Sequence, residues 1–286
     1  AVATVAAGGL ATGVGAGTAT ITAAQDGISG TASLTVRALM SITISEAVDL
    51  AWGTTKQLVA TGTYSDASTA DVTELATWTT SDAAAISVSD SAGTKGLVTG
   101  ISTAGATITA TIGTISDSSA IGGCKIVINE FQVRGTTASD EFIELASNCT
   151  SEQSLVGLRI AYRSATNANP IDGADSSLVV TLAGTMAVGE HVFYVNSAVA
   201  GSYTGERGTF TNGMADAGGL GLRVGVSATV VDMVGWGGAT NLFFETARVT
   251  APNATQSAAR TPNRADTDNN FADFALVTVK TPGAAN

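Results

Sequence analysis

Apolar and small polar side chains alternate along most of this chain, as they do in half-buried β-strands. The segment 40–81 shows the period of two at Leu58, Ala60 and Tyr64. Elsewhere, short apolar runs end at clusters of Gly, Ser, Thr and Asp, which are typical of turns. The pattern predicts an all-β protein.

One stretch near the start of the chain returns later in the sequence. Residues 9–23 read GLATGVGAGTATITA, and residues 96–110 read GLVTGISTAGATITA. Ile21 corresponds to Ile108, at a spacing of 87 residues. The repeat predicts two copies of one β unit, each about the size of an immunoglobulin-like sandwich.

The two copies differ in what precedes them. About fifty residues of strand-like sequence stand before the second copy, and the first copy has no equivalent. A sandwich without its first strands exposes unpaired backbone edges and an open apolar face, which are unfavourable in water. We expect strands of a neighbouring subunit to cover this face, in a head-to-tail contact that propagates into a filament. The residues assigned to this interface are Val2, Val5, Leu10, Val14, Ile21, Ile28, Leu34, Val36 and Trp52.

Trp52 stands apart from the other interface residues, because it precedes a Gly-Thr-Thr turn at the start of the second copy. Aromatic side chains are enriched at interfaces. We assign Trp52 to a contact with the neighbouring domain or with another subunit. The alternative is a partly exposed turn residue.

The second copy carries a family resemblance. It contains GTTKQLVATGTYSDAST, then Trp78, then the GLVTGISTAGATITA strands. Together these resemble the bacterial immunoglobulin-like domain of group 2, and residues 1–37 resemble only its C-terminal third. The resemblance implies a complete sandwich over residues 38–122, with Trp78 in its core, after an incomplete sandwich over residues 1–37.

The remainder of the chain has a different composition, with more phenylalanine and more charged residues. It contains CKIVINEFQVRGTTASDEFIELASN, LAGTMAVGEHVFYVNS and SAARTPNRADTDNNFADFALVTVKTPGAAN. These stretches resemble the bacterial lamin-tail domain, an immunoglobulin-like sandwich found on secreted and surface proteins. The resemblance implies a third sandwich over residues 123–286, and therefore tandem immunoglobulin-like sandwiches of which the first is incomplete.

The two cysteines flank a predicted hairpin. Cys124 opens the run CKIVINEFQV, and Cys149 closes the run DEFIELASNC. If Val133 faces Asp140 in an antiparallel ladder, the same register places the cysteines opposite each other, at a distance that a disulfide spans. The sequence predicts a Cys124–Cys149 bridge and an oxidising compartment. A bulge near Asn129 would shift this register, and two separate buried thiols are the alternative.

Oxygen ligands for a cation occur near the C-terminus. Asp266, Asp268 and Asn270 alternate as in a calcium loop, and Asp273 follows three residues later. However, Phe271 stands where such loops usually carry glycine, and the same side chains suit turns. Calcium is the one cofactor that the sequence suggests, with a structural turn as the alternative.

Catalytic chemistry has little support. His191 is the only histidine, and it lies in a strand-like run. Glu130, Glu141 and Glu144 follow the strand pattern around the predicted hairpin, so we assign them structural or surface roles rather than acid-base catalysis. We expect no enzyme activity.

Charge and hydropathy narrow the remaining function classes. The net charge of -11 disfavours nucleic acid. We expect no membrane span, because no apolar run reaches about 18 residues. The leading hypothesis is a secreted or cell-surface structural protein that assembles with copies of itself or with a related surface protein. The alternatives are a binding fragment of a longer adhesin and a phage decoration protein.

Overall fold

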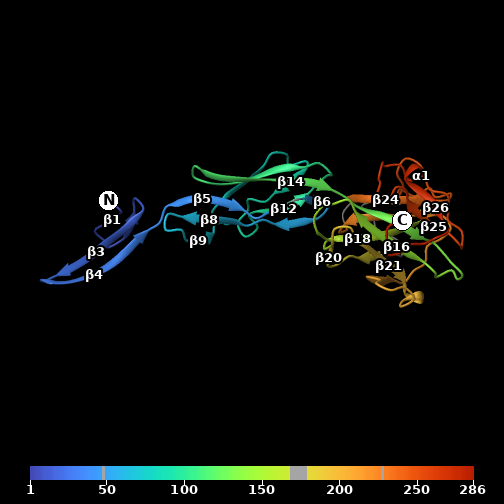
Figure 1. The fold of residues 1–286 in the computed structure, drawn as a ribbon, viewed down its shortest axis with the longest axis horizontal. Helices are drawn as coiled ribbons and strands as arrows, with labels where there is room; N and C mark the ends of the chain where they lie inside the picture. Colours follow the sequence, from blue (N-terminus) through green and yellow to red (C-terminus); the bar gives the residue numbers. More distant parts are fainter. Residues whose placement is uncertain (47–48, 168–178, 227–228) are drawn as a thin grey trace.

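The computed structural model describes residues 1–46, 49–167, 179–226 and 229–286. Its regular structure is almost entirely β-strand, which confirms the predicted all-β class. An N-terminal hairpin, a middle sandwich and a larger C-terminal sandwich follow one another along the long axis of the molecule (Figure 1). In the described part of the chain, no helix has the length and apolar character that a membrane crossing requires.

The N-terminal segment contains two small antiparallel sheets. Their strands are β1 (Ala3–Val5) with β2 (Ala11–Gly13), and β3 (Gly17–Gln25) with β4 (Ile28–Val36). The β3–β4 turn at Asp26 and Gly27 has φ of 52° and 81°, and the glycine adopts this left-handed conformation without strain. Among the described residues, no third strand pairs with β3 or β4.

The middle sandwich is built from three sheets, in the orders β10-β13-β14-β6, β11-β12-β7 and β5-β8-β9. The strands are β5 (Leu39–Ile44), β6 (Asp49–Ala51), β7 (Thr55–Gln57), β8 (Ala60–Tyr64), β9 (Thr69–Asp71), β10 (Thr77–Thr80), β11 (Ile86–Val88), β12 (Leu97–Gly100), β13 (Ala106–Ile112) and β14 (Ile115–Cys124). Trp78 is buried in the core, as expected, and its indole N–H donates to the carbonyl of Thr73. Strand β14 runs to Cys124, two residues past the expected domain end.

The C-terminal sandwich has a six-stranded sheet, β22-β21-β16-β15-β25-β26, and a four-stranded sheet, β19-β18-β23-β24. The strands are β15 (Ile126–Gln132), β16 (Phe142–Ser147), β17 (Gln153–Ser154), β18 (Leu158–Ser164), β19 (Val179–Thr181), β20 (Thr185–Met186), β21 (His191–Asn196), β22 (Gly208–Phe210), β23 (Gly218–Val224), β24 (Val230–Trp236), β25 (Ser257–Arg260) and β26 (Phe274–Val277). A 3₁₀ turn (Ser197–Val199) and the short helix α1 (Asn270–Asp273) complete it.

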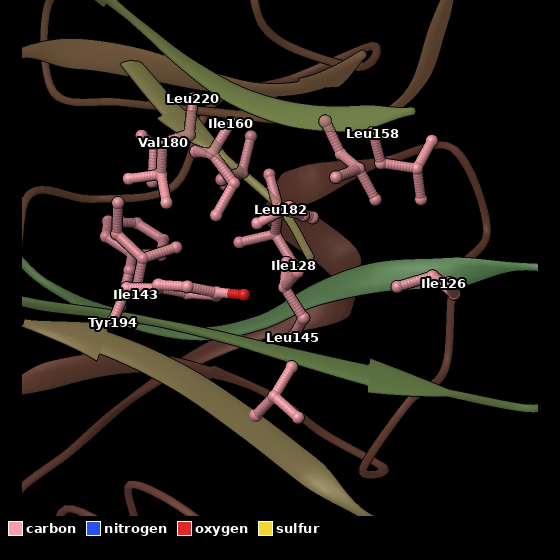
Figure 2. Packing of buried hydrophobic residues seen from close by; sticks show 14 of the residues in the cluster. Ile126, Ile128, Ile143, Leu145, Leu158, Ile160, Val180, Leu182, Tyr194 and Leu220 are labelled. Carbon is pink, nitrogen blue, oxygen red and sulfur yellow. The ribbon is translucent and has the colours of Figure 1, made fainter. Parts of the chain in front are cut away.

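The core of the C-terminal sandwich lies between these two sheets. Leu158, Ile160 and Leu220 of the four-stranded sheet face Ile128 and Ile143 of the six-stranded sheet (Figure 2). Near-continuous apolar runs in the sequence supply this core, so the sandwich is stabilised mainly by burial of apolar surface.

Candidate functional site

The apolar side chains of the N-terminal segment are largely exposed. Val5, Leu10, Val14 and Ile28 are 48%, 71%, 61% and 80% exposed. The other predicted interface residues of this segment are half-buried, and they are Val2, Ile21, Leu34 and Val36. Asp26 is the only charged side chain among the first 36 residues. The hairpin therefore lacks the charges that usually protect an open sheet edge from pairing with another chain.

The β3–β4 hairpin repeats the geometry of β13–β14. Ala19 faces Leu34 in the first hairpin, and Ala106 faces Ile121 in the second. Ala19 and Leu34 each lie 87 residues before their equivalents, Ala106 and Ile121. The sequence repeat is therefore a repeat of strand register, and the same side chains point to the same face in both hairpins.

The two hairpins differ in what covers that face. In the second hairpin, the inward side chains are buried in one core with Leu58 and Trp78, and they are Ala106, Ile108, Ala110 and Ile121. In the first hairpin, Ile21 is only half-buried and Ala23 is exposed. The first hairpin thus presents a core-type surface that the described residues cover only in part.

Trp52 lies at the joint between the middle and C-terminal sandwiches. Its side chain packs against the core of the C-terminal sandwich. Its backbone N–H donates to the backbone carbonyl of Cys124, 2.9 Å away. Trp52 therefore contacts the neighbouring domain of its own chain, which is one of the two contacts predicted for it.

Polar side chains fix the same joint. The carboxylate of Asp49 accepts hydrogen bonds from the N–H and the hydroxyl of Thr150, at 2.6 and 2.8 Å. The side-chain carbonyl of Gln153 accepts a bond from the N–H of Ala51, at 2.8 Å. Because these bonds are largely shielded from water, they hold the two sandwiches in one orientation.

A disulfide joins Cys124 to Cys149 at this joint, with the two Cα atoms 5.2 Å apart, which confirms the predicted bridge. The ladder keeps the expected register beside the cysteines and shifts by one residue at Asn129, where the bulge lies. The assumption that Val133 faces Asp140 therefore does not hold on the loop side of the bulge. The bridge forms because the correct register applies where the cysteines lie.

The four residues of the predicted calcium site do not surround one open point. Asp266 and Asp273 both pair with the buried guanidinium of Arg260, at 3.1 and 3.0 Å. Asn270 instead hydrogen bonds to the backbone of β24 and of the loop that follows it, and the side chain of Asp268 is exposed. Arg260 thus supplies the positive charge that the sequence analysis assigned to calcium, and calcium binding by these residues stays an unsupported prediction.

Lys125 is a second buried cation, which the sequence analysis missed. Its ammonium nitrogen lies 3.6 Å from Asp232, 3.7 Å from Asp268 and 4.0 Å from Glu245, and it also pairs with Asp266. No local motif indicates this cluster, because its carboxylates come from segments far away along the chain.

The pKa values in this cluster reflect burial and charge together. Burial disfavours the charged ammonium of Lys125, but the surrounding carboxylates outweigh this effect and raise its pKa. Burial, reinforced by the carboxylates of Asp232 and Asp266, raises the pKa of Glu245 to about 8. The cluster is an ion-pair network rather than a set of free carboxylates.

Three glutamates that the sequence analysis considered are fully buried. Glu130 accepts bonds from the side chain of Ser257 and from Thr281. Glu144 accepts bonds from the side chain of Asn129 at 2.8 Å and from a C-terminal backbone N–H at 2.7 Å. These contacts anchor the C-terminal residues to the six-stranded sheet, which agrees with a structural role.

The third glutamate and the histidine also have partners within the fold. Glu141 accepts bonds from the N–H of Met214 and from the side chain of Asn196. His191 is a strand residue next to Asn263, and burial lowers its pKa. Both residues take part in structural contacts.

Glu144 makes the stability of the C-terminal sandwich dependent on pH. Burial raises its pKa to about 7, compared with 4.5 in the unfolded chain. Because the folded protein binds this proton more tightly, stability is greatest below the unfolded pKa and falls as the pH rises through 7. We expect unfolding in urea to show a loss of about 2 to 3 kcal/mol between pH 5 and pH 8 from this group.

The variant Glu144→Gln should flatten that part of the pH profile. Glu190→Gln is the control, because Glu190 is a glutamate of the same sandwich that is only half-buried and pairs with Arg207 near the surface. An unchanged slope in Glu144→Gln would contradict the assignment.

Comparisons with known proteins support the middle sandwich most directly. Residues 38–121 match the bacterial Ig-like domain of group 2, which confirms that resemblance. The chain is 36% identical, over 135 residues, to Ice-binding protein 1 of Shewanella frigidimarina, a match that covers 46% of this chain and 15% of the relative. The chain therefore spans only a small part of that relative. The lamin-tail resemblance stays a prediction.

The comparison with solved structures found distant matches. Domains 4–9 of the surface layer protein SbsC share 17% identity and a TM-score of 0.30, over 82% of this chain and 37% of that one. A DUF4876 family protein from Bacteroides thetaiotaomicron shares 10% identity and a TM-score of 0.37, over 93% and 90% of the two chains. These likenesses are too distant to inform function.

Proposed function

We propose that this chain is a non-enzymatic structural protein of the bacterial cell surface, whose sandwiches form a rod and whose N-terminal hairpin joins it to a neighbouring subunit. The observation that carries the proposal is the incompletely covered core-type face of β3–β4. Its equivalent in the middle sandwich is fully covered by strands. An apolar face with open edges is unfavourable in water, so pairing with another chain is favourable.

Two further features support a structural role outside the cell. The disulfide suits an oxidising environment. The joint between the two sandwiches is fixed by the disulfide, by buried hydrogen bonds and by Trp52, which suits a rigid rod. The histidine and the buried glutamates are engaged in structural contacts, which favours a non-enzymatic role.

Sedimentation velocity at increasing protein concentration tests the proposal. The wild-type chain should associate from its 28.4 kDa monomer into end-to-end oligomers, which electron microscopy would show as filaments. Leu34→Asp places a charge on the core-type face and should weaken association at least about tenfold, since burying an unpaired charge is costly.

The matched control is Ser33→Asp, which changes the next residue on the same strand but lies on the opposite face. It should associate like the wild type. Circular dichroism of both variants should match the wild type, because neither residue belongs to the two sandwich cores.

A wild-type chain that stays monomeric at every concentration would contradict assembly. It would favour the second candidate, in which this chain is a segment of a longer surface adhesin. One observation supports that candidate: the chain spans 15% of the length of the relative that it matches.

A further inference from the structure

The hairpin needs a partner with free backbone groups, and a second copy cannot supply the strands that cover the equivalent hairpin. In each copy, β10 already pairs with β13, and β6 already pairs with the end of β14. The hairpin must therefore pair with an open strand edge of the second copy, and the outer edges of β10, β6 and β26 are among those available.

The open edge of β26 offers such a surface. β26 is the outermost strand of the six-stranded sheet and pairs only with β25. The N–H of Thr261 donates to the carbonyl of Asp273, and bonded pairs alternate along an antiparallel ladder. The N–H and C=O groups of Leu276 and the C=O of Phe274 consequently point away from β25, toward the open side, whereas the N–H of Phe274 bonds back to the carbonyl of Asn270 in α1.

Apolar surface accompanies these backbone groups. A hollow of about 570 Å³ lies beside the end of β26, and Pro262, Leu276, Val277 and Val279 contribute to its lining. The side chain of Val279 is 76% exposed. An edge strand with an adjoining apolar hollow is the arrangement that accepts an added strand, because the backbone provides affinity and the hollow accepts a side chain.

The charges and positions of the two surfaces are complementary. The only charge on the hairpin is Asp26 at its tip, and Lys280 follows the acceptor strand. The hairpin and β26 lie at opposite ends of the elongated molecule (Figure 1). A contact between them cannot close within one copy, so it propagates from copy to copy.

We propose that the β3–β4 hairpin of one copy adds to the open edge of β26 of a second copy. This inference rests on the proposed function and identifies the surface to which the hairpin binds. Backbone pairing extends the six-stranded sheet across the contact, and an exposed apolar side chain of the hairpin enters the hollow beside Val279.

Two variants test this pairing. Val279→Lys blocks the edge and leaves the hairpin intact, whereas Leu34→Asp blocks the hairpin and leaves the edge intact. Sedimentation velocity should find each variant monomeric alone, and a mixture of the two should form a one-to-one dimer. Val188→Lys is the control, because Val188 is an exposed residue of the same sandwich outside this edge, and it should form chains like the wild type.

The possible failures are distinguishable. If Val279→Lys still forms chains, β26 is not the acceptor, although assembly through the hairpin stands. If both variants are monomeric and their mixture is also monomeric, the hairpin and the edge are not partners and the proposed pairing is wrong. If the wild type never associates, both the proposed function and this inference fail.

Discussion

Replacement of Arg260 by methionine is expected to lower the free energy of unfolding of the C-terminal sandwich by about 3 to 5 kcal/mol. The guanidinium is fully buried and pairs with Asp232, Asp266 and Asp273, at 3.0 to 3.1 Å. Its Nε also donates to the carbonyl of Ile128, at 2.9 Å. Methionine fills most of the volume but leaves Asp273 without its cation, and it leaves Asp232 and Asp266 with Lys125 alone, which is the costly case.

Hydrogen exchange of peptides from β15 and β25 measures this loss within the C-terminal sandwich. Arg260→Lys keeps a positive charge but lacks the planar fork, so it should lose less than the methionine variant. The control Arg134→Met removes an exposed ion pair with Asp216 and should change stability by about 0.5 kcal/mol or less. A loss in Arg260→Met no larger than in this control would show that the network does not stabilise the fold.

Removal of the disulfide by the double variant Cys124→Ala/Cys149→Ala is expected to cost about 3.5 kcal/mol, from the chain entropy that a closed loop of this length removes from the unfolded state. The cysteines are 25 residues apart in sequence. Because the bridge lies at the joint, the loss should extend to both sandwiches that meet there.

Urea unfolding of the double variant and of the oxidised wild type measures this cost. The wild type under reducing conditions should behave like the variant, whereas the variant should not respond to a reductant. Equal stability of the oxidised wild type and the double variant would contradict a stabilising role for the bridge.

The repeat near the start of the chain could be predicted in part from the sequence. The sequence predicted a repeated β unit at a spacing of 87 residues, and the structure shows that Ala19 and Leu34 occupy the positions of Ala106 and Ile121, because strand register follows the alternation of side chains. The repeat did not show that, in a second copy, β10 and β6 are already paired with β13 and β14. That conclusion required the sheet order of the folded chain.

The predicted calcium site depends on contacts that a local sequence pattern does not contain. The spacing of Asp266 and Asp273 is compatible with a cation, and the structure does place a positive charge between them. The sequence could not identify that charge as Arg260, nor place Lys125 among the neighbouring carboxylates, because these pairs join segments that meet only in the folded sandwich.

The sequence by itself determined the all-β class, the repeat of one β unit and the pairing of the two cysteines. Each of these follows from the alternation of side chains along a strand or from the pairing of neighbouring strands, so short stretches of sequence contain it. The tertiary structure alone decided which face of the hairpin lacks a cover, which cations neutralise the buried carboxylates and which strand ends a sheet. These depend on contacts between distant segments, whose free energy is gained only when the sheets pack together.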